Sequence, residues 1–174
     1  CFSTGYTTNM GSISVLAGRR DIIYSDRENH SCIMDATQLT FAETKKYKHD
    51  DMEDLARVLE NSPADAGKLL VSDGVFSMKG TICRLPEMVA LKKKFGLRIF
   101  VDDAHGCGVI GPTGRGTAEH YGLDKEVDVV MGTFSKSFAG LGGFIAGEER
   151  VVNYVKHHAR QLIFVERMID EDLH

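Results

Sequence analysis

The sequence predicts an α/β protein, a three-layer sandwich whose central sheet is mostly parallel and is covered by helices on both faces. Two observations support this prediction. Short apolar runs bounded by turn residues alternate along the chain with segments whose apolar residues recur at helical spacing. The short runs are apolar throughout, which is typical of strands that are buried on both sides.

The individual elements follow from these runs and from local start and stop signals. Strands are expected at residues 22–24, 68–71, 98–101, 127–131 and 143–146. Helices are expected from a cap at Ser31 to Leu39, from a cap at Asp50 to Leu59, from Pro86 to Phe95 with Gly96 as the stop, and from Val151 to Leu162. No internal repeat or linker interrupts these strands and helices, which predicts one domain.

Composition excludes several classes of protein. A net charge of -4 and dispersed basic residues indicate neither a nucleic-acid partner nor an acidic membrane surface. No apolar run approaches the ~20 residues of a membrane span. The four cysteines lie far apart without a C-x-x-C pair, which favours reduced thiols and a cytoplasmic location.

Ligands of parallel sheets bind at the carboxyl ends of strands, so the residues there are the candidates for chemistry. The strand at 98–101 is followed by Asp102, Asp103, Ala104 and His105. A buried carboxylate needs a cation or a metal as its partner. Three interpretations therefore remain open for this motif: a cofactor partner, a divalent metal site with two acids and a histidine, or a simple turn cap.

A second motif follows the strand at 127–131 and contains Thr133, Phe134, Ser135, Lys136 and Phe138. The hydroxyls are suited to a phosphate. The preceding apolar strand and the two phenylalanines predict partial burial of the lysine, which would favour its neutral, nucleophilic form. The alternative is a surface lysine in a glycine-rich loop.

The first residues, Ser3 to Asn9, are small or carry hydroxyls, and Gly5 lies among them. Such a segment at the start of a helix lets backbone N–H groups approach an anion. Together the three motifs supply a lysine for an aldehyde, an acid for a ring nitrogen and donors for a phosphate. These are the groups that pyridoxal phosphate requires.

Two stretches, VDDAHGCGVIGPTGRG and DVVMGTFSKSFAGLGGFIAG, carry a family resemblance. Over roughly residues 2–164 the chain resembles the α-oxoamine synthases, which are fold-type I pyridoxal-phosphate enzymes. The resemblance implies that Lys136 is the Schiff-base lysine, which also moves the substrate's α-proton, and that Asp102 holds the ring nitrogen protonated. It implies that His30 stacks on the cofactor opposite Ala104.

The resemblance also assigns the remaining contacts of the cofactor. His105 and Ser77 are implied to hydrogen-bond near the phenolic oxygen of the ring. Gly5, Tyr6 and Thr133 are implied to bind the phosphate. Arg115 is expected to order its loop and not to touch the substrate. Without the family resemblance, His30 would be interpreted as a surface histidine at the start of a helix and Ser77 as an ordinary turn residue.

The activity implied is the condensation of an amino acid with an acyl-CoA to give an α-oxoamine, in a homodimer. Residues 132–147 and 156–160 most resemble serine palmitoyltransferase-type members, with oxononanoate synthase or glycine C-acetyltransferase activity as the alternative. Family members are more than twice as long, and the chain starts with Cys1, so we expect it to be a piece of a longer protein. The resemblance implies that residues 1–164 are part of a pyridoxal-phosphate-binding large domain and that 165–174 are a charged tail that does not match the family. A catalytically inactive fragment or partner subunit and a metal-dependent hydrolase are the two other hypotheses.

Overall fold

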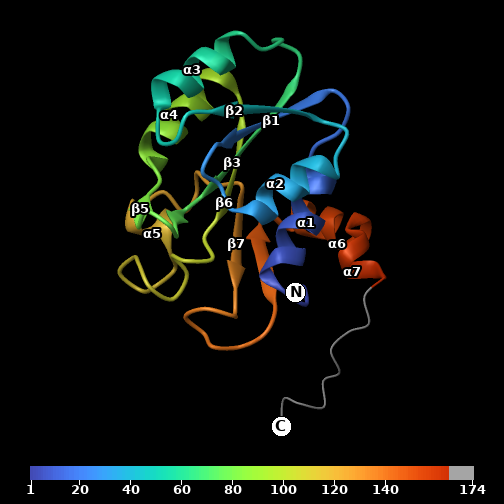
Figure 1. Ribbon diagram of the computed structural model, residues 1–174, viewed down its shortest axis with the longest axis vertical. Coiled ribbons are helices and arrows are strands. Elements are labelled where there is room, and N and C mark those ends of the chain that lie inside the picture. Colours follow the sequence, from blue (N-terminus) through green and yellow to red (C-terminus); the bar gives the residue numbers. More distant parts are fainter. Residues whose placement is uncertain (165–174) are drawn as a thin grey trace.

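A six-stranded sheet forms the centre of the computed structural model, which describes residues 1–164 (Figure 1). The strand order is β2 (Glu43–Tyr47), β1 (Asp21–Asp26), β3 (Gly67–Asp73), β6 (Arg98–Asp102), β7 (Val129–Thr133) and β8 (Gly143–Gly147). Neighbouring strands run parallel except for β8, which is antiparallel to β7. The predicted α/β class with a mostly parallel sheet is confirmed.

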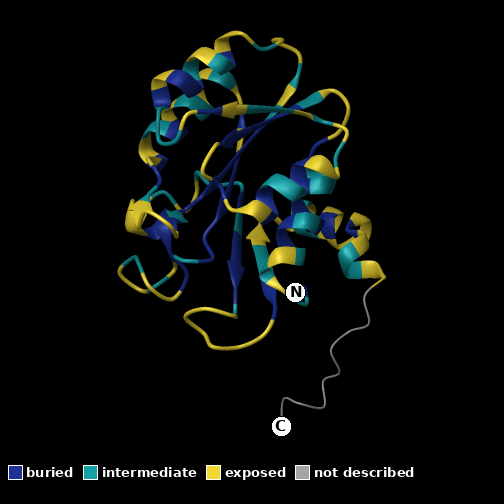
Figure 2. Ribbon diagram, viewed as in Figure 1, coloured by how far each residue is buried: buried dark blue, intermediate teal, exposed yellow. Residues whose placement is uncertain are grey.

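Helices cover both faces of this sheet. One face carries α1 (Gly5–Leu16) and α2 (Ser31–Gln38), with α6 (Glu149–His158) and α7 (Arg160–Ile163) beside them; the other carries α3 (Met52–Glu60) and α4 (Leu85–Phe95). Consecutive residues of β1 point to opposite faces of the sheet. Ile23 packs in the apolar cluster between the sheet and the helices α1 and α2, and Tyr24 packs in the cluster between the sheet and the helices α3 and α4. The strands between the layers are therefore buried almost throughout (Figure 2).

The edge strand β2 was not predicted, and its composition explains why. Its sequence is ETKKY, and only Tyr47 is buried. Edge strands carry charged side chains, especially lysine, because an apolar edge would pair with other chains. A search for apolar runs therefore finds the interior strands and misses this one.

Three predicted helix boundaries were wrong. The cap of α2 is His30 and not Ser31, because the His30 ring accepts the N–H of Cys32. The cap of α3 is Asp51, whose carboxylate accepts from Asp54 N at 2.8 Å, and not Asp50. The last predicted helix is two helices, since the backbone is extended at Ala159.

The predicted stop of α4 is confirmed. Gly96 ends α4 with a left-handed φ of 69°. All four cysteines are free thiols, and the cytoplasmic location stays a prediction. None of the helices within residues 1–164 is long and apolar enough to cross a bilayer. The predicted tail, 165–174, lies outside the described residues.

Two short elements complete the chain between the layers. A hairpin of β4 (Val75–Phe76) and β5 (Thr81–Ile82) follows β3, and the one-turn helix α5 (Thr117–His120) follows the loop after β6. The loops after β1, β3, β6 and β7 all leave the same edge of the sheet, because these strands are parallel. That edge is where the predicted site residues lie.

Candidate active site

A pocket of about 280 Å³ opens at the carboxyl ends of the parallel strands. It lies between the start of α1 and the loops that follow β1, β3, β6 and β7. Its lining includes every residue to which the sequence assigned a role at the cofactor: Gly5, Tyr6, His30, Ser77, Asp102, Ala104, His105, Thr133 and Lys136. Residues more than 130 positions apart in the sequence therefore share one cavity.

Asp102, the last residue of β6, is a buried carboxylate held by two donors. One oxygen accepts from Asn9 Nδ2 at 2.5 Å, and the other from the backbone N–H of Ala104 at 3.0 Å. These two hydrogen bonds fix the orientation of the carboxylate. Asp102 therefore offers a fixed, oriented acceptor to a protonated group in the pocket.

A second buried carboxyl, Asp73, stands beside it at the end of β3. The two aspartates are register partners across β3 and β6. Among residues 1–164, one donor bonds the Asp73 side chain, the backbone N–H of His30 at 2.8 Å. Burial raises the pKa of Asp73 to about 8, and the charge of Asp102 adds to the effect. The neutral acid is therefore the favoured form of Asp73 at neutral pH.

This raised pKa predicts how stability changes with pH. The folded state binds the proton of Asp73 more tightly than the unfolded chain, whose aspartates titrate near ~4. The stabilisation is complete below pH ~4 and is lost as the pH rises through about 8. This loss of stability is on the order of 5 kcal/mol, and we expect Asp73→Asn, which stays neutral, to abolish it. Urea unfolding of both proteins from pH 4 to 9 measures it, and parallel curves would contradict it.

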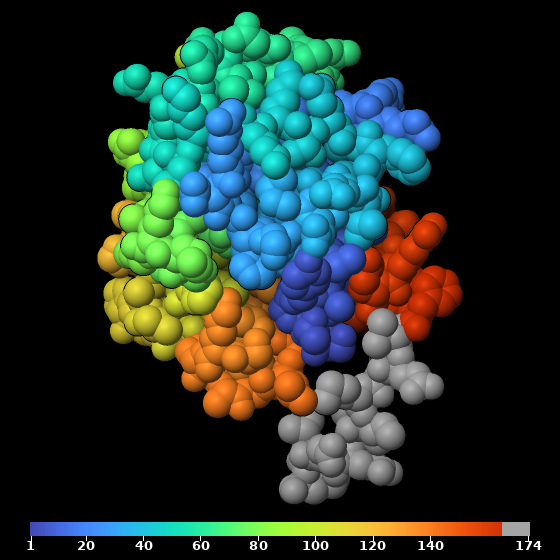
Figure 3. All heavy atoms as spheres, viewed as in Figure 1, coloured from blue at the N-terminus to red at the C-terminus, as the bar shows by residue number. Residues whose placement is uncertain are grey.

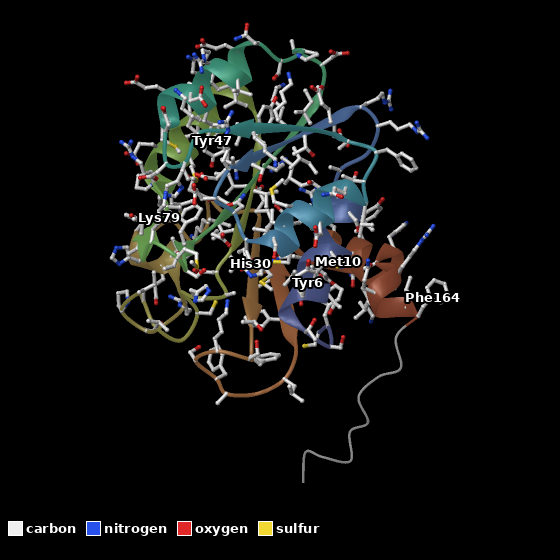
Figure 4. The ribbon with its side chains drawn as sticks, in the orientation of Figure 1. Tyr6, Met10, His30, Tyr47, Lys79 and Phe164 are labelled. Carbon is white, nitrogen blue, oxygen red and sulfur yellow. The ribbon has the colours of Figure 1, made fainter. Side chains whose placement is uncertain are left out.

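His30 lies at the junction of β1 and α2, with its ring at the mouth of the pocket (Figure 4). Its Nδ1 accepts the N–H of Cys32 at 3.2 Å and lies 2.8 Å from the Cys32 sulfur. A backbone N–H can only donate, so this contact requires Nδ1 to be unprotonated. Tyr6 stands edge-on to the ring, with the ring centres 6.4 Å apart.

Lys136 projects from the loop between β7 and β8, and its Nζ lies 2.8 Å from Nε2 of His105. The pKa of His105 is lowered by burial and by the charge of Lys136, so its ring accepts from the ammonium. The predicted partial burial of Lys136 was wrong, because the side chain is exposed. Phe138, which was expected to cover it, is itself 53% exposed.

The start of α1 packs against the end of β7 (Figure 3). The N-cap Thr4 accepts from the N–H of Thr7, and a Cβ on Gly5 would lie 2.9 Å from the Thr133 hydroxyl. A glycine thus lets the helix start approach Thr133 closely. Ser135 lies 2.9 Å from the same hydroxyl. The positive end of α1 and two hydroxyls are a donor set for an anion.

Asp103 does not join the pocket. Its carboxylate accepts from the N–H and the hydroxyl of Thr117, both at 2.6 Å, and it lies within contact of Gly74, Gly106 and Gly116. It therefore orders the loop before α5. The metal hypothesis used Asp103 with Asp102 and His105, and within residues 1–164 no three such ligands cluster.

Replacing Asp103 is expected to reduce the stability of the fold, because its carboxylate holds Thr117 and does not line the pocket. Asp103→Ala leaves two buried donors of Thr117 without an acceptor, which costs about 3 kcal/mol. Urea unfolding measures the loss, with Asp124→Ala on the surface as the control. An unchanged midpoint would show that Thr117 does not depend on this carboxylate.

The loop containing Arg115 behaves as expected. Arg115 donates through its backbone N–H and its Nε to the two oxygens of Glu119, at 2.9 and 3.0 Å. The hydroxyl and N–H of Thr113 bind the same carboxylate, and together they lower the pKa of Glu119 to about 2. Arg115 is thus a loop-ordering residue, and the prediction is confirmed.

Comparison with known proteins decides the family. The sequence model of aminotransferase class I and II proteins matches residues 1–169. The chain belongs to the aminotransferase class I and II family. Its curated relatives include the serine palmitoyltransferase of Bacteroides thetaiotaomicron, 51% identical over 164 residues, and 8-amino-7-oxononanoate synthase 1 of Bacillus subtilis, 45% identical over 163 residues. Each alignment covers 94% of this chain and 42% of the relative.

Solved structures in this family agree with the fold. The serine palmitoyltransferase of S. paucimobilis, with a bound PLP-myriocin aldimine, superimposes with a TM-score of 0.91 at 42% identity. The match covers 94% of this chain and 41% of that protein. The 8-amino-7-oxononanoate synthase of Francisella tularensis gives a TM-score of 0.77 at 28% identity, over 92% and 46% of the two chains. The expected resemblance to α-oxoamine synthases is therefore confirmed, and the chain spans about two-fifths of these relatives' length.

Asn9 and Asp73, two polar residues of the pocket, had no individual role predicted from the sequence. Asn9 holds Asp102, and its position one helical turn after Gly5 places both on one side of α1. The four-residue spacing of Gly5 and Asn9 is visible in the sequence, but the hydrogen bond from Asn9 to Asp102 is not. Asp73 ends β3 as Asp102 ends β6, so the rule that favours strand ends applied equally to both.

Proposed function

We propose that this chain is the cofactor-binding core of a pyridoxal-phosphate-dependent acyltransferase that condenses an amino acid with an acyl-CoA to an α-oxoamine. One observation carries the proposal. Lys136 and Asp102 line the same pocket, and the donor set at the start of α1 lines it too. A lysine, a fixed acid and an anion cradle within one cavity match the aldehyde, ring nitrogen and phosphate of that cofactor.

The residues fit the group in spacing as well as in kind. Gly5 in the anion cradle and Asn9, which holds Asp102, are four residues apart on α1. Four residues of an α-helix rise about 6 Å. The cradle and Asn9, which holds the acid, therefore lie about one helical turn apart along α1. His30 and Ala104 line the space between the β1 and β6 loops, which suits them to the two faces of a flat ring.

Pyridoxal phosphate, when bound, supplies an electron sink that stabilises negative charge at the substrate's α-carbon. The protein's residues have separate tasks. Asp102, oriented by Asn9 and Ala104, would hold a proton on the ring nitrogen. Lys136 Nζ would hold the cofactor through its aldehyde carbon, with loss of water, until the substrate amine takes its place; the freed Lys136 amine would then carry the α-proton. His105 and Ser77 would bind near the phenolic oxygen, and Gly5, Tyr6 and Thr133 would bind the phosphate.

The substrates are proposed from the relatives. Serine palmitoyltransferases at 50–51% identity favour serine and a long-chain acyl-CoA. The 8-amino-7-oxononanoate synthases at 45% identity support a second candidate, in which another amino acid and a different acyl-CoA react. Glycine C-acetyltransferase activity is the remaining alternative within the proposed class.

We also propose that two copies of the chain pair over the mouth of the pocket. Large apolar side chains are exposed around it, on the β4–β5 hairpin, the loop after β6 and the Lys136 loop: Met78, Val109, Phe138 and Leu141. Exposed apolar clusters of this kind are typical of protein interfaces. Sedimentation of the full chain measures the assembly.

The test of this function is an acyltransfer assay with the full chain and added pyridoxal phosphate. Serine, glycine and alanine are each combined with acetyl-CoA, pimeloyl-CoA and palmitoyl-CoA, and CoA release is followed. The fastest release is expected with serine and palmitoyl-CoA. Cofactor binding without turnover of any pair would favour the non-catalytic partner, and activity that chelators abolish and Lys136→Ala spares would favour the metal hydrolase.

A further inference from the structure

The carboxyl group of Asp73 lies next to Asp102, yet no task in the proposed reaction requires it. Asp73 is 6% exposed and lines the pocket. Within the described residues, the hydrogen bond that its side chain accepts comes from the backbone N–H of His30 and not from another side chain of the cavity. A buried acid beside another acid is costly, so its presence calls for a compensating role.

Asp73 belongs to a clamp between β3 and the loop that carries His30. Its own N–H donates to Asn29 Oδ1 at 2.9 Å. The amide of Asn29 in turn donates to the carbonyl of Val71 at 2.8 Å and to Ser25 Oγ at 2.9 Å. Asn29 is buried, so these bonds are shielded from water. The backbone on both sides of the 29–30 peptide is therefore fixed to β3.

The ring of His30 is fixed from the other side by α2. Its Nδ1 accepts the N–H of Cys32, and its backbone N–H is held by Asp73. The side chain itself is exposed, so packing does not hold it. Its position over the pocket depends on these hydrogen bonds, and Asp73 supplies the one that anchors its main chain.

We propose that Asp73 is a positioning residue, whose carboxyl oxygen anchors the main chain of His30 so that the imidazole lies over the cofactor pocket. The role needs an acceptor oxygen and not a negative charge. This inference rests on the proposed function, because it concerns the ring that His30 is proposed to stack on.

The surroundings of Asp73 favour its uncharged form, which can still accept a hydrogen bond. Burial and Asp102 raise its pKa to about 8, Asp26 acts in the same direction, and Lys136 and the His30 N–H oppose them. The nearby thiols of Cys32 and Cys83 are uncharged at neutral pH, since burial raises their pKa values to about 11 and about 12. A protonated carboxyl keeps a carbonyl oxygen that accepts as before. Asparagine at this position presents the same oxygen.

The first test is a double-mutant cycle on pyridoxal-phosphate affinity in the full chain at pH 7. Losing the stacked ring in His30→Ala is expected to weaken binding about tenfold. Asp73→Ala is expected to weaken it by a similar factor, and the double variant also about tenfold. Asp73→Asn is expected to stay within about threefold of the wild type. Independent effects, which would multiply to about a hundredfold, overturn the proposal, and so does a tenfold loss in Asp73→Asn.

The second test needs no cofactor. Hydrogen exchange of the His30 amide, followed residue by residue by NMR, is expected to be slow in the wild type and in Asp73→Asn and fast in Asp73→Ala. Unchanged protection in Asp73→Ala would overturn the anchoring role. If the wild-type chain binds no pyridoxal phosphate, the proposed function fails, and the exchange result still decides whether Asp73 anchors His30.

Discussion

Lys136→Ala is expected to abolish covalent attachment of pyridoxal phosphate. Treatment of the wild-type chain with the cofactor and borohydride should add one pyridoxyl group, and peptide mass mapping should place it on residue 136. The variant should gain no mass at that peptide. Because Lys136 is also the proposed proton carrier, acyl transfer should fall by at least about 10³-fold, near the middle of the range for general acid–base groups.

The matched control is Lys125→Ala, which removes an exposed lysine from a loop outside the pocket. It should incorporate the cofactor as the wild type does. The structure makes Lys136 the lysine to test, because its Nζ lies against the lowered-pKa ring of His105 at the rim of the cavity. Labelling spread over several lysines would contradict a single built attachment site.

Asp102→Asn is the second large expected effect. The substitution keeps the size of the side chain and removes the charge that would hold a proton on the ring nitrogen. We expect acyl transfer to fall by at least about 10²-fold. We also expect the pKa of Asp73 to fall, because the charge of Asp102 is one of the causes that raise it. The second effect requires no substrate and no cofactor.

Carboxyl-carbon NMR of the full chain measures that shift, with Asp73 followed from pH 4 to 9 in both proteins. Asp124→Asn, at an exposed position outside the pocket, is the control and should leave the titration of Asp73 unchanged. An identical titration in Asp102→Asn would show that burial alone sets the pKa of Asp73.

The sequence predicted the interior of the fold well, because buried parallel strands are largely apolar, and β1, β3, β6 and β7 each overlap a predicted run. The antiparallel edge strand β8 was also predicted, because its sequence GFIAG is apolar although the strand is only partly buried. The edge strand β2 was not predicted, because most of its side chains face solvent and are charged, which protects the sheet edge from pairing with other chains. Helix caps were misplaced by one residue at His30 and Asp51, where neighbouring polar residues offer equivalent side chains and only the backbone geometry chooses between them.

The site shows the same division between pattern and geometry. Motif and resemblance identified the residues that face the cavity, and the structure places each of them along it. Motif and resemblance did not predict the hydrogen bonds that hold these residues in place. Asn9 and Asp73 act through a partner that lies 93 and 43 positions away, and such pairs are set by strand register and helix placement. The exposure of Lys136 was missed for a related reason, since Phe138, which was expected to cover it, is itself 53% exposed.

The bridge between Phe2 and Gly143 has a consequence for biosynthesis. Phe2 N donates to Gly143 O at 2.7 Å, and the return bond is 3.0 Å. The anion cradle is therefore closed by segments about 140 residues apart in the chain. Contacts so distant carry a large loop-closure cost and form late in folding. During synthesis, the segment around Phe2 must wait until the segment around Gly143 has emerged before the anion cradle can close.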